Sequence, residues 1–169
     1  MKNKKLLYFL SRSALIAAIY ATLTLVLYPL GFGAVQFRFA EALTLLPLVF
    51  PEATLGLFVG CLVANILSPF GIIDVIFGSL ATLIAAFVVS KLKSVWIAPL
   101  APAIANAFIV GAVIAYYEIG AKSGFGAAYL YNILTVGGGE LAVCYIIGVP
   151  LTLALRKIMP KKVIAENIN

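Results

Sequence analysis

Charged and metal-binding side chains are scarce in this sequence of 169 residues. It has no histidine and two cysteines, and only 11% of its residues are charged. Cys61 and Cys144 both lie in apolar segments, so we interpret them as small core residues rather than as a disulfide or a pair of metal ligands. Without histidine and without a CxxC motif, a zinc site is not expected and a catalytic dyad is hard to build. We therefore expect no catalytic residue, no metal and no cofactor.

Phosphate-binding motifs are missing as well. The sequence has no GxxxxGK[ST] motif, and the run Gly137-Gly138-Gly139-Glu140 is not such a loop because no lysine follows it. The chain is therefore not expected to bind nucleotide phosphates by the P-loop mechanism. The three glycines precede the acidic Glu140 inside an apolar segment, where glycines allow local unwinding or the close approach of a ligand or helix.

Apolar residues, by contrast, are abundant. They make up 64% of the chain and the mean hydropathy is +1.14. An ordinary globular domain is only about 45–50% apolar, and a soluble chain of this length could not bury so much apolar surface. The composition predicts an all-α polytopic membrane protein that forms a single transmembrane domain over residues 1–169.

The apolar runs predict six spans of unequal length. They cover about 13–30, 38–50, 53–67, 72–90, 95–119 and 127–155. The second run is short for a full crossing, so it is either a tilted span or part of a re-entrant hairpin with the third. Gly56 and Gly60 in the third run are four residues apart and predict a close helix–helix contact.

The net charge of +6 is distributed as in a membrane protein rather than a nucleic-acid-binding protein. The basic residues that flank the apolar runs are Lys2, Lys4, Lys5, Arg12, Lys91, Lys93, Arg156, Lys157, Lys161 and Lys162. Only Arg38 and Lys122 fall on the other side. By the positive-inside rule both termini are cytoplasmic, which six crossings satisfy, as do four crossings with a re-entrant hairpin. No small-residue cleavage site follows the first run, so a cleavable signal peptide is not expected.

Small residues form a stripe in the first span. Ala14, Ala17, Ala18 and Ala21 have offsets of 0, 3, 4 and 7, which place them on one helical face in two overlapping small-xxx-small patterns. Such a face lets another helix approach closely. It serves either to pack within this bundle or to dock another membrane protein.

Polar residues inside the apolar runs are the candidates for a ligand site. With both termini cytoplasmic, most of them fall in the outer half of their spans. The set comprises Arg38, Glu41, Asn65, Asp74, Asn106, Glu118 and Glu140, with Tyr116, Tyr117, Tyr129 and Tyr131 nearby. This concentration favours a pocket that opens to the outside and captures a small polar molecule. The alternative is a set of separate boundary residues and interhelical hydrogen bonds.

Three of these positions have a simpler explanation as well. Arg38 and Glu41 are three residues apart and can pair on one helical face, either at the membrane boundary or at the mouth of the pocket. Asp74 falls in the first turn of its span, where the helix dipole favours a carboxylate.

The sequence resembles the QueT family of proposed queuosine-precursor S-components of energy-coupling factor (ECF) transporters. The resemblance rests on three stretches: Val35-Gln-Phe-Arg-Phe-Ala-Glu-Ala-Leu-Thr-Leu-Leu-Pro47 with Pro51-Glu52, Ala64-Asn65-Ile-Leu-Ser-Pro-Phe-Gly-Ile-Ile-Asp74, and Gly78-Ser-Leu-Ala-Thr82. It is strongest from Ala14 to Ala86. The alanine stripe is similar to the motif by which S-components dock on their coupling subunit.

This resemblance implies a six-helix bundle of the S-component type and a division of labour. The S-component captures a solute outside, a coupling subunit T binds it, and two cytosolic ATPases hydrolyse ATP. The implied solutes are the 7-deazaguanines preQ0, preQ1 and queuine. A carboxylate accepts N1–H and the exocyclic amine of such a base, so Glu140 is the first candidate, with Asn106 beside it and an aromatic ring stacking on the base. Arg38 and Glu41 would form a structural pair near the loop that closes the site.

Two other functions stay open. The chain could be an S-component for another vitamin or small solute, because one scaffold carries many solutes. It could also be a non-transporting membrane scaffold that uses its alanine and glycine faces only to bind partners. A membrane enzyme is disfavoured for lack of a catalytic set.

Overall fold

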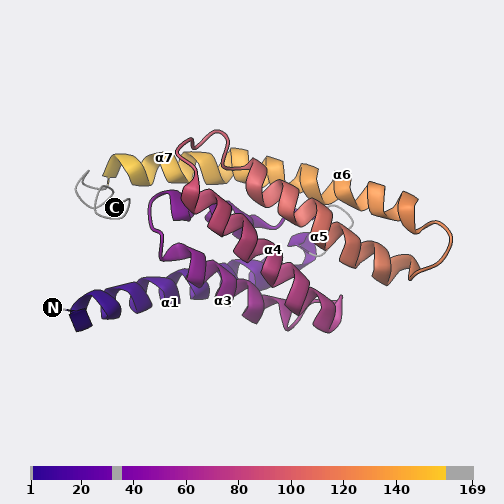
Figure 1. Cartoon of the computed structure of the whole chain (residues 1–169), viewed down its shortest axis with the longest axis horizontal. Helices are drawn as coiled ribbons and strands as arrows, with labels where there is room; N and C mark the ends of the chain where they lie inside the picture. Colours follow the sequence, from indigo (N-terminus) through magenta and orange to yellow (C-terminus); the bar gives the residue numbers. More distant parts are fainter. Residues whose placement is uncertain (1, 32–35, 159–169) are drawn as a thin grey trace.

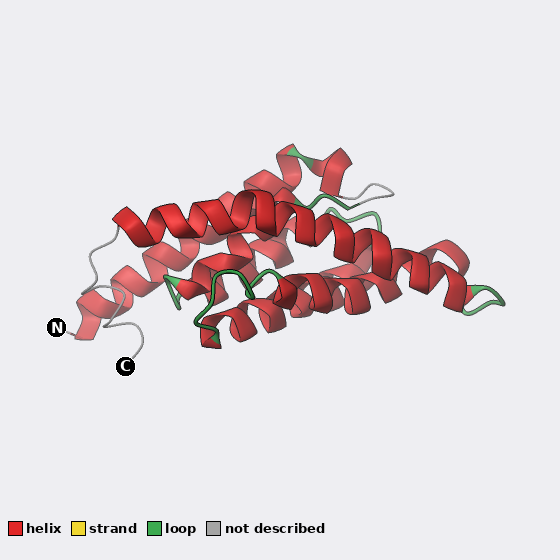
Figure 2. Ribbon diagram, turned by 90° about the horizontal axis from the view of Figure 1, so that it is seen from above, coloured by secondary structure: helices red, strands yellow, loops and turns green. Residues whose placement is uncertain are grey.

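The computed structural model describes residues 2–31 and 36–158, and over these ranges the chain is helical apart from short connections (Figure 2). The elements are α1 (Lys2–Val26), α2 (Tyr28–Gly31), η1 (Phe39–Leu48), α3 (Ala53–Asn65), α4 (Gly71–Lys91), α5 (Leu100–Ile119), α6 (Phe125–Val143), η2 (Cys144–Gly148) and α7 (Val149–Ile158). The predicted all-α class is confirmed. Residues 32–35, between the first two predicted spans, and the basic residues Lys161 and Lys162 lie outside the described residues.

Within residues 2–31 and 36–158, four helical segments are long and apolar enough to cross a membrane: α1, α4, α5 and the run from α6 through α7. The other two predicted spans are shorter. The segment η1 has 10 residues and α3 has 13. At about 2.0 Å per residue for a 3₁₀-helix and about 1.5 Å for an α-helix, each is about 20 Å long, against a hydrocarbon core of about 30 Å. The number of full crossings therefore stays a prediction.

Several helices of the structure have other bounds than the predicted spans. The first helix begins at Lys2 rather than near residue 13, and it ends at Val26, before the separate short helix α2. The fifth begins at Leu100 rather than near residue 95, directly after Pro99. Proline fixes its own φ and disfavours helix in the residue before it, so the helix begins after this residue.

The 3₁₀-helix η1 lies inside the bundle. Consecutive helices pack side by side in the order α1, α3, α4, α5 and α6, and η1 contacts α1, α3, α4, α6, η2 and α7. Every residue from Ala40 to Leu48 is buried. Figure 1 shows the start of α1 and the end of α7 at the left end of the molecule and the α5–α6 loop at the right end. The short central segment thus lies between two longer layers of helices.

The winding of η1 is unusual for its length, because 3₁₀ runs of more than three or four residues are uncommon and often mark functional or strained segments. Pro47 lies inside it and lacks a backbone N–H. The Thr44 hydroxyl donates to the Glu41 carbonyl oxygen at 2.5 Å, and the Cys144 thiol approaches the same oxygen at 3.5 Å. Side chains and a neighbouring helix therefore supply polar contacts around its backbone.

The last three elements form one rod along the molecule (Figure 1). The glycine run does not unwind the helix, since α6 continues to Val143; the irregular turn is the π-helical η2 that follows. The glycines serve close approach instead. A Cβ on Gly137 would lie 3.2 Å from the Ala107 Cβ, and one on Gly139 would overlap the Gln36 carbonyl oxygen.

Glycine also brings α1 and α3 together. A Cβ on Gly56 would lie 2.5 Å from the Ser13 carbonyl oxygen, and one on Gly60 would lie 2.7 Å from the Ala17 carbonyl oxygen. Backbone atoms on α1 cannot move aside as a flexible side chain can. The predicted close contact through this glycine pair is therefore confirmed, and it seats α1 directly on α3.

Gly60→Leu should destabilise the bundle because its side chain would collide with the α1 backbone. Overpacking of this kind costs about 1–3 kcal/mol or more. We expect a lower midpoint of thermal unfolding in detergent and loss of the monodisperse peak in size-exclusion chromatography. Gly138→Leu is the matched control, since a Cβ there meets nothing within 4 Å. Equal behaviour of the two variants would contradict this packing.

Candidate functional site

Glu41, near the start of η1, is the centre of a buried polar network. Its Oε1 accepts hydrogen bonds from the Tyr20 hydroxyl of α1 and from the Thr82 Oγ1 of α4, the latter at 3.1 Å. The residues Tyr20, Glu41 and Thr82 have no exposed surface. A buried carboxylate costs much free energy unless hydrogen-bonded, and these donors come from helices on two sides of η1.

Arg38 extends this network towards α3. Its Nη2 donates to the Asn65 Oδ1 at 3.1 Å and lies 3.5 Å from the Tyr20 hydroxyl. The Asn65 amide in turn donates to the Asp74 carbonyl oxygen at 3.2 Å. The sequence-predicted residues Arg38, Glu41, Asn65 and Asp74 are therefore brought together at one buried place.

Asp74 lies in the first turn of α4, as predicted, but its side chain does not cap the helix. Its Oδ2 instead accepts a hydrogen bond from the Ser68 hydroxyl at 2.6 Å, and Ser68 also accepts from the Phe70 backbone N–H at 3.2 Å. The carboxylate thus fastens the α3–α4 turn beneath the network. Its position in the first turn is also favoured by the helix dipole.

A second buried pair lies between α5 and α6. The Asn106 Nδ2 donates to the Glu140 Oε1 at 2.8 Å, and both side chains are at most 1% exposed. Gly139, next to Glu140 on α6, lies against the Gln36 carbonyl oxygen just before η1, and α6 contacts η1 directly. The α5–α6 pair and the η1 network therefore belong to one region of the bundle interior.

This region contains five hydrogen-bond acceptors that are not used within the protein. Among the described residues, these buried oxygens without a hydrogen-bond partner are Gln36 Oε1, Glu41 Oε2, Asp74 Oδ1, Asn106 Oδ1 and Glu140 Oε2. A buried polar atom without a partner costs about 1–3 kcal/mol, and more when it carries charge, so several in one region call for an explanation. Such a group of acceptors suits a ligand rich in N–H donors.

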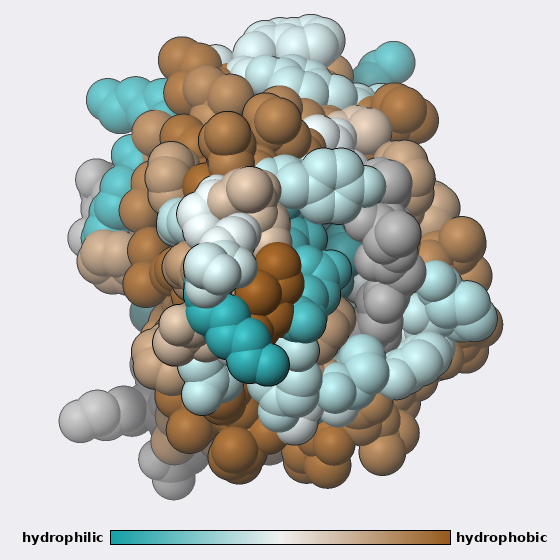
Figure 3. Space-filling view, turned by 90° about the vertical axis from the view of Figure 1, so that its right-hand side faces the viewer, coloured by the Kyte–Doolittle hydropathy of each residue, from teal (hydrophilic) through white to brown (hydrophobic). Residues whose placement is uncertain are grey.

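The end of the bundle near the α5–α6 loop is hollowed. Figure 3 views the molecule from this end and shows hydrophilic groups in the middle of the face, set in a depression between more apolar surfaces. A polar hollow at one end of a helical membrane bundle is typical of a solute-binding membrane protein.

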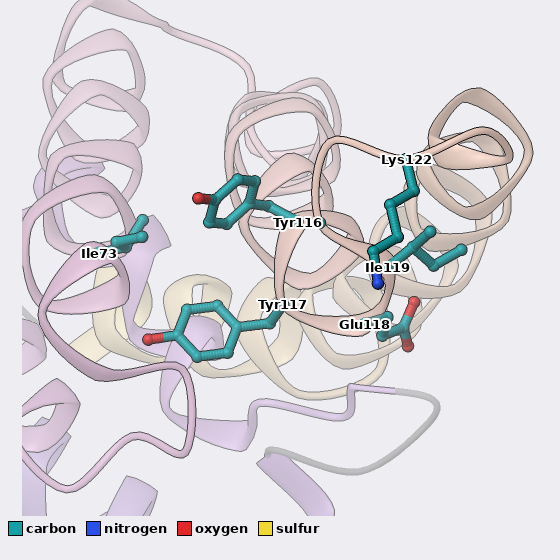
Figure 4. Close-up of a pocket in the computed structure, with 7 residues that line it drawn as sticks. Ile73, Tyr116, Tyr117, Glu118, Ile119 and Lys122 are labelled. Carbon is teal, nitrogen blue, oxygen red and sulfur yellow. The ribbon is translucent and has the colours of Figure 1, made fainter.

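Tyr116 and Tyr131 lie apart from the buried network. Their side chains are 51% and 57% exposed. Tyr116 lines a surface pocket of about 420 Å³ with Ile73, Tyr117, Glu118 and Lys122. Figure 4 shows both tyrosines of α5 extending towards Ile73 of α4. Tyr116 thus lines a pocket at the surface near the α5–α6 loop. Among the described residues, no hydrogen bond joins Tyr131 to the buried network.

Sequence reasoning missed Gln36, Tyr20 and Thr82 as members of the site. Gln36 lies outside the predicted spans, so no helical periodicity indicated which way its side chain faces. Tyr20 did have one, because Ser13, Tyr20 and Thr24 recur at offsets of 7 and 4 along α1 and are all buried. A buried tyrosine usually finds a hydrogen-bond partner, so this polar row could have indicated a partner on the facing element.

The alanine stripe of α1 divides into two faces in the structure. Ala14 and Ala18 are exposed, whereas Ala17 and Ala21 are partly buried. The Ala17 backbone packs against Gly60 of α3. Of the two interpretations of the stripe, packing within the bundle therefore accounts for Ala17, and an exposed small-residue face is left at Ala14 and Ala18.

Comparison with known proteins gives one family and one named relative. The QueT transporter family matches residues 10–157. A relative named queuosine precursor transporter QueT, from Lactococcus lactis subsp. cremoris (strain MG1363), is 35% identical over 86 residues, which is 50% of this chain and 50% of the relative. The alignment thus spans about half the length of this relative. No solved structure matches the chain.

Tyr20→Phe should destabilise the protein, because it removes a hydrogen bond to a buried carboxylate while keeping the ring. Loss of such a donor costs about 1–3 kcal/mol. The measurement is thermal unfolding in detergent. Tyr8→Phe is the matched control, since Tyr8 is on the same helix and 67% exposed. If the Tyr20→Phe variant unfolds at the same temperature as the control, the Tyr20 hydrogen bond does not stabilise the protein.

Proposed function

Because the chain belongs to the QueT transporter family, we propose that it is the substrate-binding S-component of an ATP-driven ECF importer and captures a queuosine precursor, a 7-deazaguanine, from outside the cell. The group of buried acceptors around Glu140 carries this proposal. The name of the Lactococcus lactis relative agrees with it. The protein itself would bind the solute, and a coupling subunit T with two cytosolic ATPases would supply the energy.

The chemistry of the α5–α6 pair suits a guanine-like edge. Such an edge presents N1–H and an exocyclic amine as adjacent donors. Glu140 Oε2 and Asn106 Oδ1 are two buried acceptors joined through the Asn106–Glu140 hydrogen bond. The base would donate to both at once, and the bonds to the carboxylate would be charge-assisted. Transfer of the base from water into the site costs little free energy when its N–H donors find such hydrogen-bond partners.

The orientation in the membrane follows from the arrangement of charge. Lys4 and Lys5 near the N-terminus and Arg156 and Lys157 near the C-terminal end of α7 lie at the same end of the molecule (Figure 1). We place this end in the cytoplasm by the positive-inside rule, with both termini inside. The hollow near the α5–α6 loop then faces outwards. This assignment does not depend on whether η1 and α3 cross the bilayer fully or form a re-entrant hairpin.

Purified protein should bind preQ1 saturably, and Glu140→Gln should weaken that binding more than tenfold. The substitution keeps the shape of the side chain and removes the charge that strengthens the hydrogen bonds, worth about 1.5–3 kcal/mol for a charged partner. Equilibrium binding of labelled preQ1 measures both.

Glu52→Gln is the control for this experiment, since Glu52 pairs with Arg12 at 2.8 Å away from the site. An unchanged dissociation constant in Glu140→Gln would remove Glu140 from the site. Absence of saturable binding for every 7-deazaguanine would reject the substrate, and a thermal-shift panel with other vitamins would then look for another solute.

The exposed alanines of α1 would dock the coupling subunit. Replacing Ala14 or Ala18 with Leu should abolish co-purification with subunit T while leaving ligand binding intact, because these side chains do not enter the interior. Ala154→Leu is the control, an exposed alanine on α7. If ligand binding and co-purification fail together, the stripe serves packing within the bundle instead.

A further inference from the structure

Carboxylates outnumber cations in the buried site. The buried ionisable residues of this region are three acids, Glu41, Asp74 and Glu140, and one base, Arg38, so the acids exceed the bases by two formal charges. The other buried acid, Glu52, is paired with Arg12 elsewhere. Uncompensated charge is costly in an interior surrounded by lipid. A neutral ligand would leave this imbalance in place, whereas a ligand with one positive charge would offset half of it.

The two glutamates are not equivalent in what they offer a ligand. Glu140 is joined to the Asn106 amide, so its free oxygen and the Asn106 carbonyl oxygen form a pair suited to two adjacent donors. Glu41 has its own donors on Oε1 and one free oxygen, Oε2. A guanine-like edge that occupies the Glu140 pair leaves Glu41 Oε2 for a separate donor of the same ligand.

Arg38 is the cation that could oppose a second positive charge here. Its Nη2 lies near the Tyr20 hydroxyl and the Asn65 Oδ1. The Tyr20 hydroxyl is the same group that donates to Glu41 Oε1. Arg38 is thus linked to Glu41 Oε1 through the Tyr20 hydroxyl, whereas Glu41 Oε2 has no hydrogen-bond partner among the described residues.

From these contacts we infer that Glu41 determines specificity and selects 7-deazaguanines whose 7-substituent carries a protonated amine. This inference rests on the proposed function, because it presupposes that the base is bound at Glu140 and Asn106. The ammonium group would donate to Glu41 Oε2, with Gln36 Oε1 as a further buried acceptor in the same region. A 7-cyano or 7-methyl group has no N–H to donate and no charge to offset. Glu41 is thereby assigned a direct contact with the ligand, in place of a purely structural pairing with Arg38.

The test compares three ligands that share the base and differ at the 7-position: 7-aminomethyl-, 7-methyl- and 7-cyano-7-deazaguanine. The methyl compound is neutral and smaller by one amine group. We expect wild-type protein to bind the aminomethyl compound about tenfold more tightly than either neutral one, or more, as a charge-assisted hydrogen bond would give. Glu41→Gln should bring the three affinities to within about threefold by lowering that for the aminomethyl compound alone.

Two further variants separate the roles of the carboxylates. Glu140→Gln should weaken all three ligands by a similar factor, because they share the edge that it binds. Glu41→Asp keeps the charge and should retain part of the preference for the amine. The comparison of ligands on wild-type protein needs no variant, so it decides the charge preference even if Glu41→Gln fails to fold.

Three results would overturn the inference and leave the proposed function standing. They are equal binding of the aminomethyl and methyl compounds by wild type, an equal loss for all three ligands in Glu41→Gln, and loss of the amine preference in Glu140→Gln rather than in the Glu41 variants. Absence of binding by all three to wild type would instead reject the proposed function, and this inference with it.

Discussion

The structure depends on the burial of a charged segment in the middle of an apolar bundle. Glu41 lies near the start of η1, and every residue from Ala40 to Val49 is buried. Lipid-facing helices surround this segment. Water is not there to solvate the carboxylate, so the surrounding helices must supply its hydrogen bonds. Tyr20 of α1 and Thr82 of α4 do so, and neither helix could move away without exposing the charge to an apolar environment. The requirement to satisfy one acid thus fixes the relative position of three elements.

Close backbone contacts make that arrangement possible. The Tyr20 hydroxyl reaches η1 only if α1 lies near the bundle axis, and Gly60 lets α1 rest on α3 at that depth, with a Cβ position 2.9 Å from the Tyr20 Cβ. Gly148 does the same on the other side, where a Cβ would lie 2.9 Å from the Ala42 carbonyl oxygen of η1. Small residues in membrane helices let the helix backbones approach one another closely. Here this close approach brings the side chains of the site within hydrogen-bonding distance.

The sequence predicted the parts of this structure that follow from composition and spacing. Length and hydropathy gave the helices α3 and α4 nearly to the residue, and the i, i+4 spacing of Gly56 and Gly60 predicted a real contact. It also singled out Asn106 and Glu140 as polar residues deep in their apolar runs, but it did not predict the hydrogen bond that joins them. The hydrogen bonds of Arg38 to Asn65 and Tyr20 were not predictable, since they join residues 27 and 18 positions apart through tertiary packing. Nor was the 3₁₀ winding of η1, which no local pattern specifies.

Helix α1 combines the two tasks that the proposed function requires. Its inner face carries Tyr20, which holds the Glu41 carboxylate, and its outer face presents Ala14 and Ala18 within about two turns of it. A helix is stiff over that distance, so a shift of Tyr20 that follows a change at Glu41 would also shift the outer face. The interior and the exposed surface of α1 therefore respond to the same movement. A subunit that must bind a solute and also associate with a partner needs such an element between the two sites, and α1 carries both Tyr20 and the exposed alanines at which docking is proposed.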